Sequence, residues 1–177
     1  MTYYAFIQYN KISGCGECIQ LTPSVQNVEI TEEVYNNIDD YIWDGSEVIL
    51  DPELDEKKLQ EAKENKIAVN DFARDEALIQ GVTYKDVLFD SDTDQKVNLL
   101  ATVSMMGEED TIVWFGMDNQ PLECNKQDLI NIGGLITQLH TFCWNKNAEI
   151  KEAINEATTI EEVEAIEIDY TLPVEEV

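Results

Sequence analysis

The sequence predicts an α+β protein with three parts: a small β-rich N-terminal unit (residues 1–50), a spacer helix (51–81) and a C-terminal α+β domain (82–177). Short runs of β-branched and aromatic residues alternate with turn residues, which is typical of antiparallel hairpins. Two longer segments repeat apolar residues at helical spacing. With 44% hydrophobic residues, the chain of 177 residues has enough apolar side chains for a buried core.

The first fifty residues alternate β-favouring segments with turn residues. They predict short strands at 3–9, 19–21, 28–30, 41–43 and 47–50. The stretch from Asn10 to Gly16 predicts a turn, and Thr31 is suited to cap a short helix that ends at Ile38. Asp44-Gly45 predicts a type I′ turn, because these residues tolerate the positive φ angles that such a turn needs.

The segment 51–81 predicts one long helix. Asp51 is suited to the N-cap and Pro52 to the first helical position, whereas Gly81 is suited to the C-terminal cap. The first half is mostly charged and the apolar stripe is narrow, so two interpretations remain: a spacer between domains and a weak coiled-coil seam. We favour the spacer.

The C-terminal domain alternates hairpins with helices. Its predicted strands lie at 82–84, 87–89, 111–115, 121–124 and 166–170, its helices at 93–106, 126–156 and 158–165, and a frayed end at 172–177. Asn125 with Asp128, and Thr158 with Glu161, have the spacing of capping boxes. Gly133-Gly134 in the long helix permits close approach of a neighbouring backbone.

The charge is strongly negative and unevenly distributed. The chain has 37 Asp and Glu, 11 Lys and Arg and one His, for a net charge of −26. Residues 1–56 hold 12 acids and one base, and residues 152–177 hold nine acids and no base. This disfavours direct binding to nucleic-acid phosphates or anionic lipids, which need a positive surface. It indicates either a solvated, repulsive surface or a basic partner.

Targeting and membrane signals are missing from the sequence. No apolar run is long enough to span a bilayer, and no cationic segment precedes an apolar one as in a secretory signal. We therefore expect no membrane association.

No pattern in the sequence predicts catalysis, so we expect a non-enzymatic protein with no catalytic residues and no cofactor. A glycine-rich phosphate loop is absent. Asp90-x-Asp92-x-Asp94 begins like a calcium loop but lacks its glycine and glutamate, and we interpret it as a helix cap.

The cysteines provide only weak metal candidates. Cys15 and Cys18 form a CxxC, and with His140 and Cys143 they have the ligand types of a tetrahedral zinc site. However, His140 and Cys143 fall on a long apolar helix, where core positions are the usual explanation. A redox CxxC needs a following helix, which Pro23 blocks. We therefore predict no metal, and reduced thiols in a turn, as in a cytosolic compartment.

Several weak motifs together carry a resemblance. In the second half of the chain they are Gly81 to Tyr84, Phe89 to Gln95, Trp114 before Asp118-Asn119, Asp128 to Cys143 and Ile154 to Val163. Through them, residues 76–170 resemble a domain of unknown function at the C-terminus of many small tailed-phage proteins. Through Tyr3-Tyr4-Ala5, Ile30 to Asn36 and Ile42 to Gly45, residues 2–50 resemble the leader of small proteins encoded beside phage tail fibres.

The resemblance implies a tail or tail-fibre role in a phage, prophage or tailocin. Such a protein would be a structural adaptor, a receptor-binding accessory or a fibre-assembly chaperone, in the virion tail or in the host cytoplasm during assembly. Its partners would be tail-fibre or other tail proteins, and a homo-oligomer stays open. The contact surface would include Tyr3, Tyr4, Trp43 and Trp114. The interpretation that we favour for these four is that they fill two small cores.

A different function is also compatible with the charge. Rows of acids such as those over 161–169 make the chain a candidate DNA mimic that inhibits a host nucleic-acid enzyme. A mimic needs carboxylates spaced along one face like duplex phosphates, and its binding would be strongly salt-sensitive.

Overall fold

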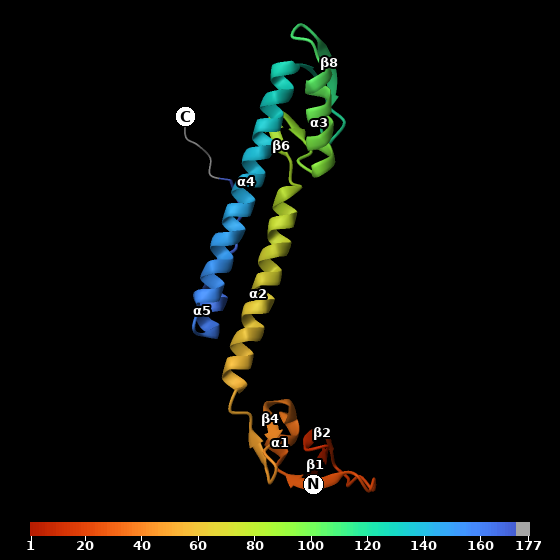
Figure 1. Ribbon diagram of the computed structural model, residues 1–177, viewed down its shortest axis with the longest axis vertical. Helices are drawn as coiled ribbons and strands as arrows, with labels where there is room; N and C mark the ends of the chain where they lie inside the picture. The colour runs from red at the N-terminus through yellow and green to blue at the C-terminus, as the bar shows by residue number, and fades with distance from the viewer. Residues whose placement is uncertain (173–177) are drawn as a thin grey trace. The chain divides into compact units, whose positions relative to one another are not determined.

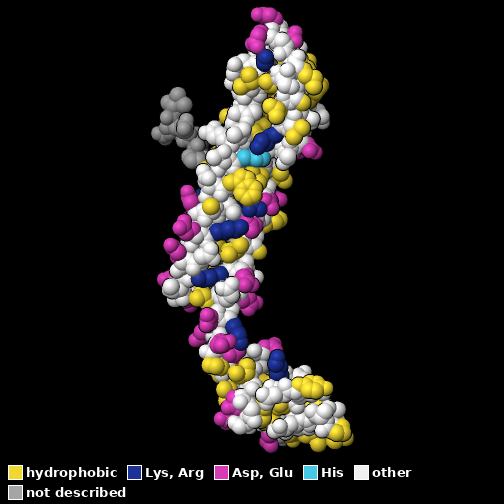
Figure 2. All heavy atoms as spheres, in the orientation of Figure 1, with side chains coloured by type: hydrophobic (Ala, Val, Ile, Leu, Met, Phe, Trp, Pro, Cys, Tyr) yellow, Lys and Arg dark blue, Asp and Glu magenta, His cyan; other side chains and the backbone are white. Residues whose placement is uncertain are grey.

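The computed structural model describes residues 1–172, which form two compact units divided between Gln60 and Glu61. Helices make up 48% and antiparallel strands 23%, which confirms the α+β class. The division falls inside helix α2 (Leu54–Leu78), so most of the predicted spacer belongs to the second unit (Figure 1). Acidic side chains lie on both units in the face shown in Figure 2.

A three-stranded antiparallel sheet is the centre of the first unit. Strand β1 (Tyr3–Gln8) lies between β2 (Lys11–Gly16) and β3 (Gln26–Ile30). The middle strand buries three consecutive residues, Ala5, Phe6 and Ile7. Successive side chains of a strand point to opposite faces of the sheet, so burial of three in a row means that both faces of β1 are covered.

The predictions of a turn at 10–16 and a strand at 19–21 are wrong. Tyr9 and Asn10 make the turn, with φ angles of 51° and 61°, and β2 follows immediately. Residues 19–21 pair with no strand, because the backbone of Gln20 exchanges two hydrogen bonds with the Asn27 side chain instead.

Four short elements complete the first unit: α1 (Glu32–Asn36), the 3₁₀ helix η1 (Ile38–Asp40), β4 (Tyr41–Trp43) and β5 (Val48–Leu50). The Thr31 cap is confirmed, since its hydroxyl accepts the Val34 N–H at 3.2 Å. The predicted two-residue type I′ turn is wrong. Four residues connect β4 to β5, and the Asp44 carboxylate accepts the N–H groups of Ser46 and Glu47.

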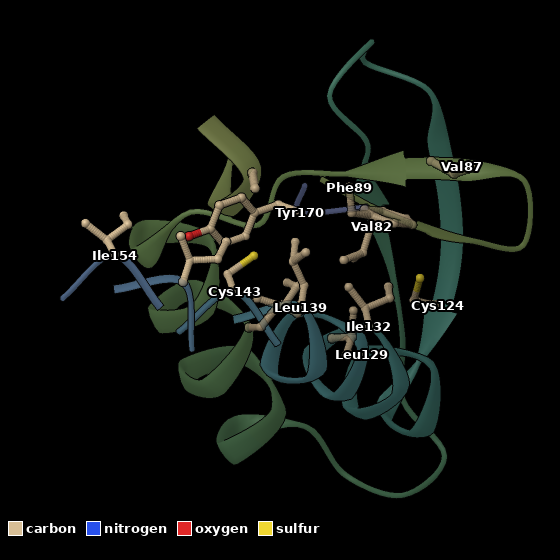
Figure 3. Close-up of a cluster of buried hydrophobic side chains, with 14 residues drawn as sticks. Val82, Val87, Phe89, Cys124, Leu129, Ile132, Leu139, Cys143, Ile154 and Tyr170 are labelled. Carbon is tan, nitrogen blue, oxygen red and sulfur yellow. The ribbon is translucent and has the colours of Figure 1, made fainter. Parts of the chain in front are cut away.

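Helix α4 (Lys126–Glu156) is the axis of the second unit. Its row of buried residues recurs every three or four positions, as Leu129, Ile132, Ile136, Leu139, Cys143, Asn147, Ile150 and Ile154, of which all but Asn147 are apolar. Around it lie β6 (Val82–Tyr84), β7 (Val87–Phe89), α3 (Thr93–Met105), β8 (Thr111–Phe115), β9 (Pro121–Asn125) and α5 (Ile160–Ala165). Figure 3 shows Val82 and Phe89 of the β6–β7 hairpin pointing toward this row.

The part of α2 after Gln60 runs beside α4 (Figure 1). Asn70 is completely buried; its amide oxygen accepts the Tyr170 hydroxyl at 2.8 Å and its amide nitrogen donates to the Asn147 carbonyl at 3.4 Å. The Arg74 guanidinium lies 4.5 Å from the centre of the Trp144 ring. Most of α2 is therefore packed on the C-terminal unit.

Two boundaries in the second unit differ from the prediction. The last helix is capped by Thr159, whose hydroxyl accepts the Glu162 N–H, so the predicted cap at Thr158 is one residue early. The strand predicted at 166–170 is wrong, because these residues pair with no other strand. Beyond Leu172, the predicted frayed end lies outside the described residues. Over residues 1–172, no helix combines the length and apolar character that crossing a bilayer requires.

Two glycines permit a matched test of the packing. Gly81 has a φ of +88°, and a Cβ there would lie 2.7 Å from the Phe89 carbonyl oxygen. Gly133 is helical, and a Cβ there would have no atom within 4 Å. We expect Gly81→Ala to lower the free energy of unfolding by about 1–3 kcal/mol, and Gly133→Ala to raise it by up to about 1 kcal/mol. Urea denaturation measures both. Equal stability of the two variants would contradict this packing.

Candidate protein-binding groove

An open apolar groove lies between α3 and α4 in the second unit. Its volume is about 460 Å³. Buried Leu99 and Leu129 line it together with Val97, Leu100 and Ile130, which are exposed. Val97 is 59% and Leu100 72% exposed, so the groove presents apolar side chains directly to solvent. Figure 2 shows hydrophobic side chains exposed over this part of the unit.

The groove follows from the way the sequence distributes apolar residues around α3. Asp92 begins this helix by accepting the Gln95 N–H at 2.7 Å. Leu99 points to the core, whereas Leu100 lies about 100° and Val97 about 160° around the helix from it, both on the same side. A single partner helix cannot cover all three directions, and α4 covers only that of Leu99.

Gly133 lines the groove on the α4 side. The sequence indicates that Gly133-Gly134 permits close approach of a neighbouring backbone, yet no atom from outside the adjoining turns of α4 lies within 4 Å of the Cβ position of either glycine. The space that these glycines create is therefore open to solvent or to a partner.

Acidic residues occur at both ends of the groove. Asp92 and Asp94 are exposed at the start of α3, and the exposed stretch 108–110 (Glu-Glu-Asp) follows its end. Among residues 1–172, Lys96 is the one cationic residue that lines the groove, and its Nζ lies 3.5 Å from His140 Nδ1. The groove is thus mostly apolar along its length, and acids outnumber bases at each end, although Lys126 pairs with Glu108 at 2.8 Å.

Contacts with Ser91 and Lys96 explain the position of the His140 ring. Its Nε2 lies 2.6 Å from the Ser91 carbonyl oxygen, and because a carbonyl only accepts, Nε2 carries the proton. Nδ1 is then the acceptor that faces Lys96. The side chain is half-buried at the edge of α3, and not enclosed in the core as the apolar helix predicts.

The four candidate metal ligands predicted from the sequence are divided between the two units. Cys15 and Cys18 are in and just after β2, whereas His140 and Cys143 are on α4. Burial raises the pKa of the Cys15 and Cys143 thiols, which favours the protonated form. All four cysteines are free. Within residues 1–172, no group of three or more His, Cys, Asp or Glu residues is arranged to hold a metal ion.

The four aromatic residues predicted at a contact surface are half-buried: Tyr3, Tyr4, Trp43 and Trp114. The Tyr3 ring stacks on Tyr35 with centroids 4.5 Å apart, and Trp114 packs against the core of the second unit. The residues that line the groove, Val97 and Leu100, are ones that sequence analysis missed as a site. Both lie on the side of α3 away from buried Leu99, and only the structure shows which apolar residue of this helix is buried.

Asp128 anchors the end of α4 that borders the groove. Its carboxylate accepts hydrogen bonds from Lys85 Nζ at 2.7 Å, the Tyr84 hydroxyl at 2.9 Å and the Asn125 N–H at 3.1 Å. These contacts, above all that of Lys85, hold the pKa of Asp128 below its usual range. The predicted capping box of Asn125 and Asp128 is confirmed.

The depressed pKa of Asp128 gives a prediction with a defined sign. The ionised carboxylate is favoured in the folded state, so its stabilisation is complete above the unfolded-state pKa, near 4, and is lost as the pH falls through the lower folded-state value. Asp128→Asn should lower the free energy of unfolding by about 1–2 kcal/mol at pH 7, and this deficit should shrink below about pH 4. Exposed Glu152 on the same helix supplies the control, and Glu152→Gln should show no such deficit. A deficit independent of pH would contradict the assignment.

Comparison with known proteins adds one finding. Residues 61–171 match the family described as a domain of unknown function (DUF4376). No curated protein and no solved structure matches the chain. The matched range starts where the second compact unit starts, at Glu61, and covers more than half of the chain. The chain therefore belongs to the DUF4376 family.

Proposed function

We propose that this protein is a non-enzymatic phage or tailocin protein, associated with the tail or tail fibre, that binds another tail protein through the α3–α4 groove. The observation that carries the proposal is the exposure of Val97 and Leu100 beside a groove that no described residue fills. Adaptor, receptor-binding accessory and fibre-assembly chaperone are the roles that such binding would serve.

The chemistry of the groove supports a protein partner. Exposed apolar surface is unfavourable in water by about 25 cal/mol per Å², so covering it favours association. Recognition of a small molecule or a substrate usually adds several converging polar groups. Here the polar lining residues are Thr93, Lys96 and Thr137, and Lys96 faces His140. An open apolar groove between two helices is a recurrent binding site for protein segments.

The tail assignment is supported by the resemblance of residues 76–170 to a domain of tailed-phage proteins. That stretch lies within the family match at 61–171, so the resemblance and the groove concern the same unit. The DNA-mimic alternative has less support, because several carboxylates are paired with cations. Examples are Asp51 with Lys57, Asp71 with Lys151 and Asp128 with Lys85.

Affinity isolation from phage-producing cells tests the proposal with a matched pair of variants. Val97→Glu places a charge at the groove, whereas Val69→Glu places one on α2, outside the groove, at a valine of nearly equal exposure (56% against 59%). We expect the wild type and Val69→Glu to retain a tail or tail-fibre protein. Val97→Glu should retain roughly tenfold less or lower, as for the loss of an interface hot spot. Mass spectrometry identifies and quantifies the captured protein.

Two outcomes of this experiment would overturn the proposal. One is that no tail protein is captured and the chain is absent from purified particles. The other is the salt-sensitive capture of a host nucleic-acid enzyme by all three proteins, which would favour the DNA mimic. Circular dichroism of both variants confirms that each remains folded.

A further inference from the structure

We propose that the occupant of the groove is an amphipathic α-helix of the partner that carries basic residues at both ends. This inference rests on the proposed function and specifies the chemistry of its partner. It depends on the dimensions of the groove, the open space at Gly133 and the charge at the two ends.

The dimensions match about three helical turns. The lining residues of α3 extend from Thr93 to Val103, or about 15 Å at 1.5 Å per residue. Those of α4 extend from Leu129 to Thr137. Lys96 near the start of α3 lies beside His140, which follows Thr137, so the two walls run antiparallel. A helix of roughly 11 residues spans this length and presents apolar side chains at i, i+3 or i+4, and i+7.

The open space at Gly133 lies in the middle of the α4 wall. A Cβ at this position would meet no atom of another element within 4 Å, so the partner's central side chain can approach the α4 backbone directly. Leu99 and Leu129, both buried, lie at the base of the same groove and supply an apolar surface for that side chain. A large apolar anchor at the centre of the partner helix fits this position.

The charges select a partner with basic ends. Asp92 and Asp94 lie at one end of α3 against the single charge of Lys96, and residues 108–110 lie beyond the other end, where Lys126 pairs with Glu108 at 2.8 Å and leaves Glu109 and Asp110 in excess. Figure 2 shows acidic side chains gathered at the far end of this unit and near the start of α3. Lysine or arginine at both ends of a bound helix would meet these carboxylates, whereas acidic ends would be repelled.

The same charges argue against a second copy of the chain. Each copy carries a net charge of −26, and the groove of each copy has acidic residues at both ends. Packing two grooves against one another would bring these carboxylates together in either orientation, which is unfavourable. The complementary partner is a basic segment of a different protein.

The test uses a fluorescein-labelled peptide of about 14 residues with leucines at i, i+3, i+7 and i+10 and two lysines at each end. A control peptide has glutamates in place of the four lysines. We expect the lysine peptide to bind the full chain and the glutamate peptide to bind roughly tenfold more weakly at low salt, with a smaller difference at high salt. Fluorescence anisotropy measures all dissociation constants.

Protein variants identify where the peptide binds. Val97→Glu and the uncharged Gly133→Leu, which fills the centre of the groove, should each weaken binding of the lysine peptide roughly tenfold or more. Val69→Glu should leave the dissociation constant within about twofold. Asp94→Asn combined with Glu109→Gln should reduce the preference for lysine over glutamate ends without abolishing binding.

Several results would overturn the inference. In the peptide assay they are equal binding of both peptides, no binding of the lysine peptide, or binding that Val97→Glu and Gly133→Leu leave unchanged. In analytical ultracentrifugation it is a dimer that Val97→Glu dissociates. The proposed function is tested separately by capture of a tail protein. If a tail protein is captured in a manner that depends on Val97 but the lysine peptide does not bind, the proposed function is supported and the basic helix is excluded. Peptide binding at the groove without capture of a tail protein would exclude the tail role instead.

Discussion

The single buried row of α4 is the constraint on which the second unit depends. Its apolar side chains run from Leu129 to Ile154, and the hairpins, α3 and the segment that ends in Tyr170 all pack against it. One row of side chains can be covered from only a limited range of directions. The hairpins and α2 occupy other parts of that range, and α3 packs on α4 through buried Leu99 while Val97 and Leu100 stay exposed. The groove is the space that this incomplete contact leaves.

Two buried polar contacts determine how the surrounding segments are positioned along that row. Asn147 interrupts the apolar row on α4, and it provides the carbonyl that Asn70 of α2 requires. Tyr170 completes the arrangement through its hydroxyl. Because a buried amide without a partner costs about 1–3 kcal/mol, a shift of α2 along α4 by one turn would be unfavourable. Apolar side chains alone would distinguish such registers less strongly.

Local chemistry explains which parts of the fold the sequence predicts well. The hairpin β6–β7, the start of α3 and the capping box of α4 depend on residues within a few positions, and their predicted bounds agree with the structure. At residues 10–16 the neighbour is also local, since β2 pairs with the adjacent β1, and the prediction is wrong because Tyr9 and Asn10 complete the turn in two residues. Residues 166–170 instead depend on distant neighbours such as Asn70, and there the prediction of a strand is wrong. The groove is in the second category. Val97, Leu99 and Leu100 are equally apolar, and only packing determines which of them is buried.

The pairing of α2 with the end of the chain also bears on folding during synthesis. Asn70 bonds to a residue 100 positions later, and Lys66 donates to the Glu164 carbonyl 98 positions later. At about 5–20 residues per second, the ribosome needs roughly 5–20 s to supply these partners. Until then α2 lacks its partner, and its high charge density favours solvation over aggregation. The polar composition that is typical of a spacer helix therefore also suits a helix that is exposed to solvent until the segments that pack on it have been synthesised.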